Sequence, residues 1–174
     1  MPSRLHEMKM NLLFKRVSFG LLALATIAAT LTCIDYFGGH TMGLFSGSQP
    51  GGLGFTDGKF KLPAWKPNCV SSTVEKTDAH YIAPIPFSGD GPSALAQVAS
   101  IIKSYRRAQL ITQRPDYLYA EYKSAGMGFI DDVEFALDAM AGVIHVRSAS
   151  RLGIGDLGVN RQRIEQLRAQ MAAK

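Results

Sequence analysis

An uninterrupted apolar segment near the N-terminus constrains this chain more than any other feature. Residues 17–34 are 18 residues without a charged side chain. As a helix they would span about 27 Å, close to the thickness of the hydrocarbon core of a bilayer. Tyr36 and Phe37 follow, and aromatic residues of this kind are typical of a membrane interface. The segment 17–37 therefore predicts a transmembrane helix.

Two other fates of this segment remain open. A cleaved signal peptide has an apolar region of about 7 to 15 residues that ends at a small-x-small site. The matching site, at residues 23–25, would leave only about six apolar residues, which is short for that purpose. Lipidation of Cys33 would favour Leu near the third position before it and Gly or Ala directly before it, where Thr30 and Thr32 stand. A retained helix is the interpretation we favour.

Charge predicts the orientation of the segment. The chain has 19 Lys and Arg against 14 Asp and Glu, a formal net charge of +5. Residues 1–16 contain four basic and one acidic side chain, and no Lys or Arg lies between the segment and Lys59. The positive-inside rule then leaves residues 1–16 in the cytoplasm and exports the chain from residue 38 onward. We expect a single-pass protein of the inner, cytoplasmic membrane with a periplasmic or otherwise extracytoplasmic domain.

The rest of the basic excess lies at the C-terminus. Residues 147–174 contain six basic and two acidic side chains, whereas residues 38–146 carry a net charge of −1. A surface that binds nucleic acid needs a stripe of Lys and Arg interleaved with aromatic residues. The middle of this chain has no such stripe, so the sequence predicts no nucleic-acid partner.

Composition and periodicity divide the remaining chain into a tether and one domain. Residues 38–68 contain eight Gly and three Pro, which predicts a tether without regular helix before a globular domain at 69–174. Apolar periodicity predicts one helix at 92–107 and a last helix that includes Ile164, Leu167 and Met171. Strands are expected at residues 81–87, 109–113, 117–124, 129–137 and 143–148. This order predicts an α+β fold, an antiparallel sheet of about five strands with two helices packed on one face.

One predicted strand places a carboxylate among apolar side chains. The two-residue period puts Asp131 on the same face as Phe129, Val133, Phe135 and Leu137. A carboxylate in that position must be paired or protonated. An ion pair with an arginine of the next strand or the loop after it, Arg147 or Arg151, would satisfy it. A ligand site that uses the same arginines and a catalytic carboxylate remain as alternatives.

Four motifs resemble a known family. They are Pro-Asn-Cys-Val-Ser-Ser at 67–72, Gly-Phe-Ile-Asp-Asp-Val-Glu-Phe at 128–135, Val-Ile-His-Val-Arg-Ser-Ala-Ser-Arg at 143–151 and Gly-Asp-Leu-Gly-Val-Asn-Arg at 155–161. In this order and spacing the chain closely resembles the family catalogued as domain of unknown function 1499, from about residue 53 to residue 171. The resemblance implies an exported or membrane-attached domain and supplies no mechanism.

Signals for catalysis are weak. The candidates are Asp131, His80 and Cys69, of which the cysteine is expected to be a lone thiol because Cys33 lies in the predicted span. Neither Ser71 nor Ser72 stands in a Gly-x-Ser-x-Gly motif. No His, Cys and Asp residues are grouped at metal-ligand spacing, so the sequence predicts no metal site and no cofactor.

Signals for binding are stronger around the start of the last helix. Donor groups gather there, and a helix N-terminus favours anions, so a phosphate-bearing ligand, an anionic lipid headgroup or carboxylates of a partner could bind. In the alternative, Asp156 caps the helix and neighbouring carboxylates pair with the arginines. The candidate ligand-binding residues are Asp131, Asp132, Arg147, Ser148, Ser150, Arg151, Asn160 and Arg161.

These features leave three functional hypotheses. The first is a membrane-anchored, non-catalytic binding or assembly module that engages a membrane protein partner or an anionic ligand. The second is a lipid-binding domain with a cavity between its sheet and its helices. The third is an exported enzyme of the hydrolase type that uses Asp131 with His80 or Cys69.

Overall fold

The structure is a computed structural model, and it describes residues 45–173. The predicted cytoplasmic segment 1–16 and the predicted span 17–37 lie outside the described residues. Within residues 45–173 neither helix is long and apolar enough to cross a membrane. The described chain belongs to a compact unit with its own hydrophobic core.

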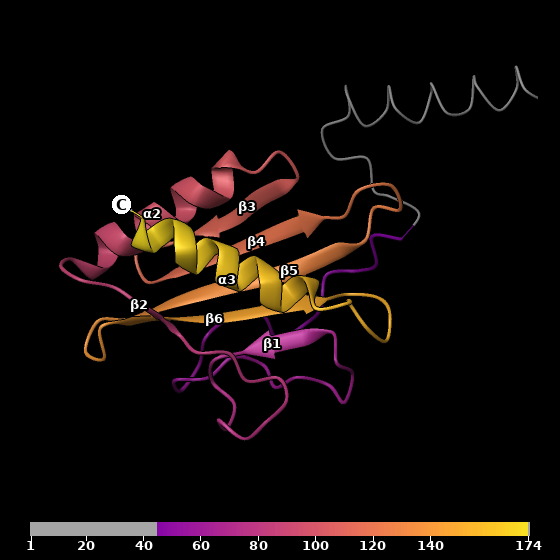
Figure 1. The fold of residues 1–174 in the computed structure, drawn as a ribbon, viewed down its shortest axis with the longest axis horizontal. Coiled ribbons are helices and arrows are strands. Elements are labelled where there is room, and N and C mark those ends of the chain that lie inside the picture. The colour runs from indigo at the N-terminus through magenta and orange to yellow at the C-terminus, as the bar shows by residue number, and fades with distance from the viewer. Residues whose placement is uncertain (1–44, 174) are drawn as a thin grey trace, which may run out of the picture. The chain divides into compact units, whose positions relative to one another are not determined.

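Six strands form one antiparallel sheet (Figure 1). They are β1 (Cys69–Ser71), β2 (Ile85–Pro86), β3 (Ala108–Gln113), β4 (Tyr117–Lys123), β5 (Ile130–Asp138) and β6 (Val143–Ser150). The order across the sheet is β1-β6-β5-β4-β3, and β2 also pairs with β6. The predicted α+β class and the antiparallel sheet are confirmed, with six strands in the described chain where about five were expected.

The two shortest strands, β1 and β2, are the ones for which the prediction from sequence differs most from the structure. The predicted strand at 81–87 is wrong except for β2, because Pro84 and Pro86 have no backbone N–H to donate to a neighbouring strand. No strand was predicted at β1, which pairs with the far end of β6 in the register Cys69 to Ala149. Three residues are too few to show a period, so β1 is defined by its partner.

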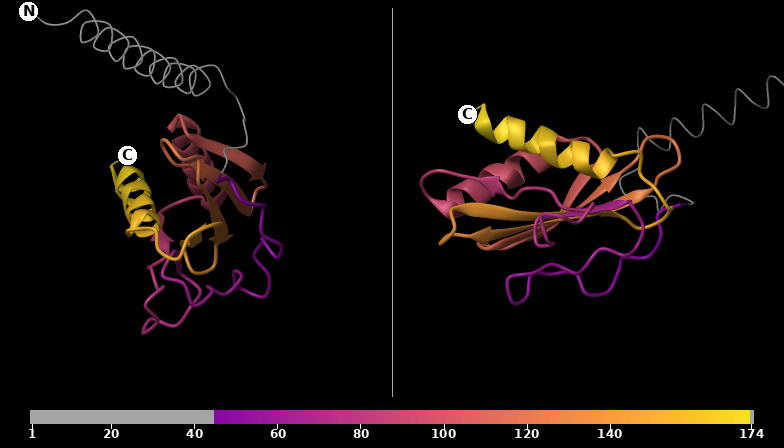
Figure 2. Two further views of the ribbon diagram at one scale, coloured as in Figure 1. Left: turned by 90° about the vertical axis from the view of Figure 1, so that its right-hand side faces the viewer. Right: turned by 60° about the horizontal axis from the view of Figure 1, so that its bottom comes forward.

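Two helices cover one face of the sheet, as predicted (Figure 2). Helix α2 (Gly91–Ser104) begins after Asp90, whose carboxylate accepts a hydrogen bond from the backbone N–H of Ser93 at 2.8 Å. Helix α3 (Val159–Ala172) follows the loop after β6. The main core lies between these helices and the sheet, and its largest fully buried members include Leu95, Ile102, Leu118, Phe135, Ile144, Ile164 and Leu167.

A non-helical segment covers the opposite face of the sheet (Figure 2). We call residues 51–61 the strap. Phe60, 3% exposed, forms a second small core with Tyr117, Tyr119 and Ala136 of the sheet. The ring of Phe55 packs beside it, with the two centroids 4.8 Å apart. The strap lies within the predicted tether and has no regular helix, and its aromatic rings pack on the folded domain.

Candidate functional site

A row of charged side chains lies between the sheet and the strap, and we call it the ionic row. Because side chains alternate along a strand, residues two apart on β5 and β6 and their cross-strand partners share this face. Glu121 of β4 lies opposite Asp132 of β5, and Glu134 of β5 lies opposite Arg147 of β6. The row consists of Glu121, Asp132, Glu134, Arg147 and Arg151.

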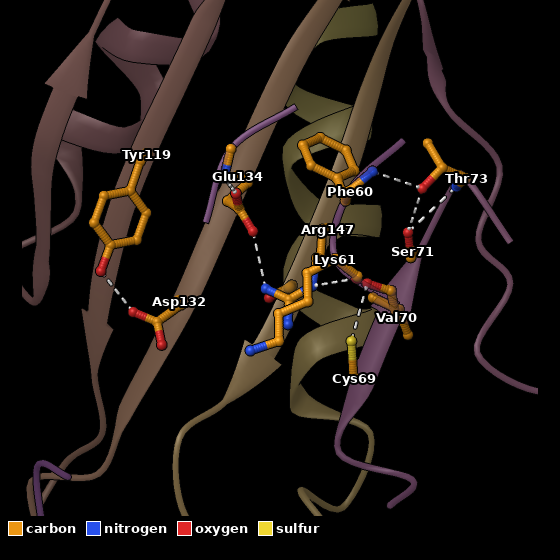
Figure 3. Close-up of polar contacts among 12 residues, drawn as sticks. Phe60, Lys61, Cys69, Val70, Ser71, Thr73, Tyr119, Asp132, Glu134 and Arg147 are labelled. Atoms are coloured by element: carbon orange, nitrogen blue, oxygen red, sulfur yellow. Dashed lines mark hydrogen bonds and ion pairs between the residues drawn. The ribbon is translucent and has the colours of Figure 1, made fainter. Parts of the chain in front are cut away.

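The centre of the row is a buried ion pair (Figure 3). Arg147 Nη1 lies 2.9 Å from Glu134 Oε2, and these residues are 6% and 0% exposed. Glu134 Oε1 accepts two more hydrogen bonds, from Tyr117 Oη at 2.8 Å and from the backbone N–H of Gly54 in the strap at 2.7 Å. Arg147 Nε donates to the carbonyl of Lys61 at 3.2 Å. The strap thus completes the coordination of both charges.

The outer end of the row is a guanidinium shared by two carboxylates. Arg151 donates to Asp132 through Nε at 3.0 Å and Nη2 at 2.7 Å, and Nη2 also contacts Glu121. Tyr119 Oη lies 2.6 Å from Asp132 Oδ1 and 2.9 Å from Glu121 Oε1. Burial and the bond to Asp132 raise the pKa of the Tyr119 hydroxyl. Burial opposes the charge of Arg151, but its bonds to Asp132 and Glu121 outweigh this and raise its pKa.

The ion pair predicted for Asp131 is wrong in its partner. Asp131 faces the helices, whereas Arg147 and Arg151 lie on the strap face, so neither arginine can reach it. Its partner is Arg163 of α3, which contacts Asp131 Oδ2 through Nη2. The guanidinium of Arg163 also lies 4.7 Å from the centroid of the Tyr122 ring. Residue spacing within β5 gave the face of Asp131 correctly but gave no information about which turn of α3 lies above it.

Three of the predicted ligand-binding residues meet beneath α3 and bind one another. Asn160, fully buried, donates from Nδ2 to Ser150 Oγ and to the carbonyl of Asn68, both at 3.0 Å. Its Oδ1 accepts hydrogen bonds from Ser148 Oγ at 2.5 Å and from Arg163 Nη1 at 2.6 Å. This network fastens the first turn of α3 to β6 and to the residue before β1.

The start of α3 is occupied by a carboxylate of the chain itself. Asp156 accepts the backbone N–H of Gly158 at 3.0 Å and that of Asn160 at 2.9 Å. Partial burial opposes the charge, but these two N–H groups outweigh it and lower the pKa of Asp156. Arg161 donates to the carbonyl of Ala79 at 3.1 Å. The donors that an external anion would need therefore have internal acceptors, and anion binding here stays a prediction.

The three predicted catalytic candidates do not converge. Asp131 lies on the helix face, while Cys69 lies on the strap face, where its Sγ donates to the carbonyl of Val70. His80 is held by Asp78 Oδ1 at 2.7 Å from Nδ1 and by the carbonyl of Lys66 at 3.0 Å from Nε2. Burial raises the pKa of the Cys69 thiol to about 11. Among residues 45–173, no group of three or more His, Cys, Asp or Glu side chains could hold a metal ion.

The structure also joins a serine, a histidine and an aspartate that the sequence did not connect. Ser72 Oγ lies 3.1 Å from His145 Nδ1, and His145 Nε2 lies 3.8 Å from Asp138 Oδ2. A serine-hydrolase triad uses the two ring nitrogens in the opposite roles. Ser72 is also buried, and its Oγ accepts the backbone N–H of Val146 at 2.9 Å. The arrangement ties the end of β1 to β6 and does not present a nucleophile.

Sequence reasoning identified Asp132 and both arginines of the ionic row but missed Glu121 and Glu134. Asp131 stands out in the sequence as the one charge on an apolar face of β5, whereas Glu134 and Glu121 lie on the polar faces of their strands. The available signal was the alternation itself, which places Asp132 and Glu134 two residues apart on one face of β5. For Arg163 no such signal exists, since its contact depends on how α3 packs.

Comparison with known proteins places the domain in a family. Residues 61–171 match the family described as protein of unknown function (DUF1499), and this match spans more than half of the 174 residues. No curated protein and no solved structure matches the chain. The matched residues contain all six strands, helix α2 and all of helix α3 except Ala172. The chain belongs to the DUF1499 family.

Proposed function

We propose that the protein is a membrane-anchored, extracytoplasmic binding module without catalytic activity. The observation that carries the proposal is the state of its polar interior. Glu134, Asp132 and Asp131 each have an arginine of the same chain as partner, and the strap donates the last hydrogen bond to Glu134. Buried charges satisfied in this way maintain a fold, whereas a catalytic group needs a free side toward its substrate.

The membrane anchor is supported by the sequence of residues 17–37. An apolar run of this length fits the bilayer, and four basic residues precede it. The domain is then displayed on the extracytoplasmic side, where a module without a reaction of its own would engage a membrane protein partner or an anionic ligand.

A lipid-binding cavity has less support. The described domain has a groove of about 450 Å³ between the start of α2 and the turn from β3 to β4. It is open to solvent, whereas a site that buries a lipid chain is enclosed and largely apolar. Its lining residues are Pro92, Leu95, Ala96, Gln113, Arg114, Pro115 and Leu118.

Reporter fusions test the anchor and its orientation. Alkaline phosphatase fused after Lys174 is expected to be active, and a fluorescent protein that matures only in the cytoplasm is expected to stay dark. The matched control replaces Arg4, Lys9, Lys15 and Arg16 with Asn, which removes the charge signal and is expected to reduce phosphatase activity. Phosphatase activity that is absent in the parent fusion would contradict the proposed orientation.

Membrane extraction separates the three fates of the N-terminus. A retained helix keeps the full-length chain in the pellet after carbonate washing, with or without Cys33→Ser. A cleaved signal releases a shorter chain into the wash, and a lipidated cysteine makes membrane attachment depend on Cys33. Either of these two results would contradict the proposed transmembrane anchor.

Absence of a nucleophilic serine is tested with a serine-reactive fluorophosphonate probe on the intact chain in mild detergent. No labelling is expected, because Ser72 is buried and already accepts a backbone hydrogen bond. Labelling that disappears in Ser72→Ala would overturn the non-catalytic proposal. A pull-down from the same detergent, with mass spectrometry of proteins and lipids, is expected to identify a co-purifying membrane protein.

A further inference from the structure

One end of the sheet displays a group of exposed apolar side chains. Ile154 is 65% exposed, Met127 is 59% exposed and Leu157 is fully exposed. Large apolar residues are seldom gathered on a free surface without a use. We call the group the apolar rim, and its members are Phe45, Met127, Leu152, Ile154, Leu157 and Val159.

The rim is formed by three segments that meet at this end. The loop between β4 and β5 and the loop between β6 and α3 lie at the same end of the sheet (Figure 1). They are joined by a hydrogen bond from the backbone N–H of Arg151 to the carbonyl of Ile130, at 3.0 Å. Phe45 joins them through its ring, whose centroid lies 5.4 Å from that of Phe129.

The rim segments carry almost no charge. Residues 45–50, 124–129 and 151–159 contain only two charged side chains, Arg151 and Asp156. Arg151 is bound in the ionic row, and Asp156 accepts the N–H groups at the start of α3. Burial of the rim in an apolar medium therefore requires neither of these charges to give up its partner.

The most exposed residue of the rim has an unfavourable backbone conformation. Leu157 has a φ of 53°, in the left-handed region that residues other than glycine and asparagine seldom adopt. Asn or Gly would fit this position with less strain. A leucine that is both strained and fully exposed is unfavourable for the isolated domain, and such outliers gather at functional positions.

The position of the rim in the chain identifies what it contacts. Residue 45 belongs to the rim, and the predicted span ends at residue 37. The seven residues between them reach at most about 25 Å when fully extended. On the proposed membrane-anchored function, on which this step rests, the rim is a part of the domain that the chain holds close to the bilayer.

We propose that the apolar rim inserts into the extracytoplasmic surface of the lipid bilayer. Uncharged loops with apolar tips bury their side chains at the boundary between headgroups and acyl chains, as interfacial segments do. The domain then rests on the membrane by one end of its sheet, while the strap, α2 and α3 beyond its first residue remain accessible from the aqueous side.

The test measures contact with lipid at a rim position and at a matched position far from it. Leu157→Cys and Met140→Cys are each made in the full chain with Cys33→Ser and Cys69→Ser, and the new thiol is labelled with an environment-sensitive fluorophore. Met140 is the control because it is also fully exposed and apolar but lies in the turn between β5 and β6, at the other end of β5. Both chains are reconstituted in vesicles of phosphatidylcholine and phosphatidylglycerol.

Acyl chains brominated near the headgroup quench only a fluorophore that touches them. The expected result is a blue-shifted emission at position 157 that is lost with brominated lipid, and no change at position 140. Equal, weak quenching at both positions in chains that float with the vesicles would overturn the rim proposal alone. A blue shift without quenching would point to a protein contact and would also overturn it. Chains that fail to float would overturn the membrane anchor first.

A substitution separates lipid contact from folding. Leu157→Asn introduces a polar residue that tolerates the left-handed region. Because the backbone strain is lower, the melting temperature is expected to stay equal or rise. With the fluorophore at Ile154→Cys in the same loop, quenching by brominated lipid is expected to fall when Leu157→Asn is added. Unchanged quenching would contradict a role of Leu157 in insertion.

Discussion

At the scale of single residues, the domain depends on charged side chains that have little contact with water. Replacing Glu134 with Gln leaves Arg147 buried beside a neutral amide. Breaking a buried pair by removing one partner costs about 3 to 5 kcal/mol, so the free energy of unfolding should fall by that order. Urea denaturation, monitored by circular dichroism, measures this free energy of unfolding.

The matched control is Glu165→Gln, which removes an exposed partner of Arg168 on α3. Its expected effect is below about 1 kcal/mol, because solvent screens exposed pairs. Similar losses in the two variants would contradict the interpretation of Glu134 as the centre of the buried network. The variant Arg147→Met combined with Glu134→Leu should recover part of the stability lost by Glu134→Gln, because no unpaired charge remains.

Two tyrosines differ in whether their hydroxyl groups have a partner. Within the described chain, the hydroxyl of Tyr122 is buried without a hydrogen-bond partner, whereas that of Tyr119 contacts Asp132. An unsatisfied buried polar group costs about 1 to 3 kcal/mol. Tyr122→Phe is therefore expected to raise the melting temperature or leave it unchanged, and Tyr119→Phe to lower it. A melting temperature that falls in both variants, or rises in both, would contradict this difference between the two hydroxyl groups.

The thiol of Cys69 is predicted to be unreactive in the folded protein. Its pKa is raised to about 11 by burial, so the thiolate is scarce below that pH. In the unfolded chain the thiol ionises near its ordinary value of about 8.5. The stabilisation from a neutral Cys69 is thus complete below that value and is lost as pH rises toward 11. Alkylation of Cys69 by iodoacetamide in the Cys33→Ser chain measures the reactivity of the thiol. Alkylation is expected to be slow in the folded chain and fast in urea.

At the scale of elements, the strap is predicted to be a structural part of the domain. Phe60→Ala removes a ring that is 3% exposed, and such deletions cost about 3 to 5 kcal/mol. Leu62→Ala, two residues later and 68% exposed, should cost less than about 0.5 kcal/mol. Thermal melting of both variants measures this difference in stability. Equal melting temperatures would show that the strap adds little stability.

Elements with enough local periodicity were predictable. Strands β4, β5 and β6 each show alternation within one continuous stretch of sequence, and α2 shows helical apolar spacing in the same way. The structure confirms these elements. The strap was not predictable, because Leu53, Phe55 and Phe60 stand among glycines without a helical or strand period. It takes its conformation from the strap face of the sheet, where Tyr117 and Tyr119 receive its rings.

The same division applies to the candidate site. Strand alternation fixed the face of Asp131 from sequence alone, and the structure agrees, but the pairing expected with Arg147 or Arg151 put these arginines on the wrong face. It could not assign Arg163 to Asp131, because that contact depends on the packing angle of a helix 32 residues away. Pairing within a sheet is readable from period and order, whereas pairing between layers requires the packed structure.

At the scale of the whole molecule, the folded domain is expected to unfold in one step. The strap, the sheet and α3 share buried groups, such as Glu134 with Gly54 and Asn160 with Asn68. For 129 residues the enthalpy of unfolding near 60 °C is roughly 90 kcal/mol. Hydrogen exchange at the amides of Gly54 and Phe60, which donate to Glu134 and Thr73, reports on the strap, while far-ultraviolet circular dichroism reports on the sheet. Two separate transitions would show that the strap unfolds independently.

The pairing of β1 with β6 also determines the order in which the domain can assemble. Cys69 leaves the ribosome 80 residues before its partner Ala149. The hairpins from β3 to β6 close over short connections and are expected to form first, because nearby segments lose less chain entropy on meeting. The strap and β1 can join only afterwards. An emerging chain therefore keeps a glycine-rich segment exposed until β6 is made, and the core can close only when α3, which follows β6, has also been synthesised.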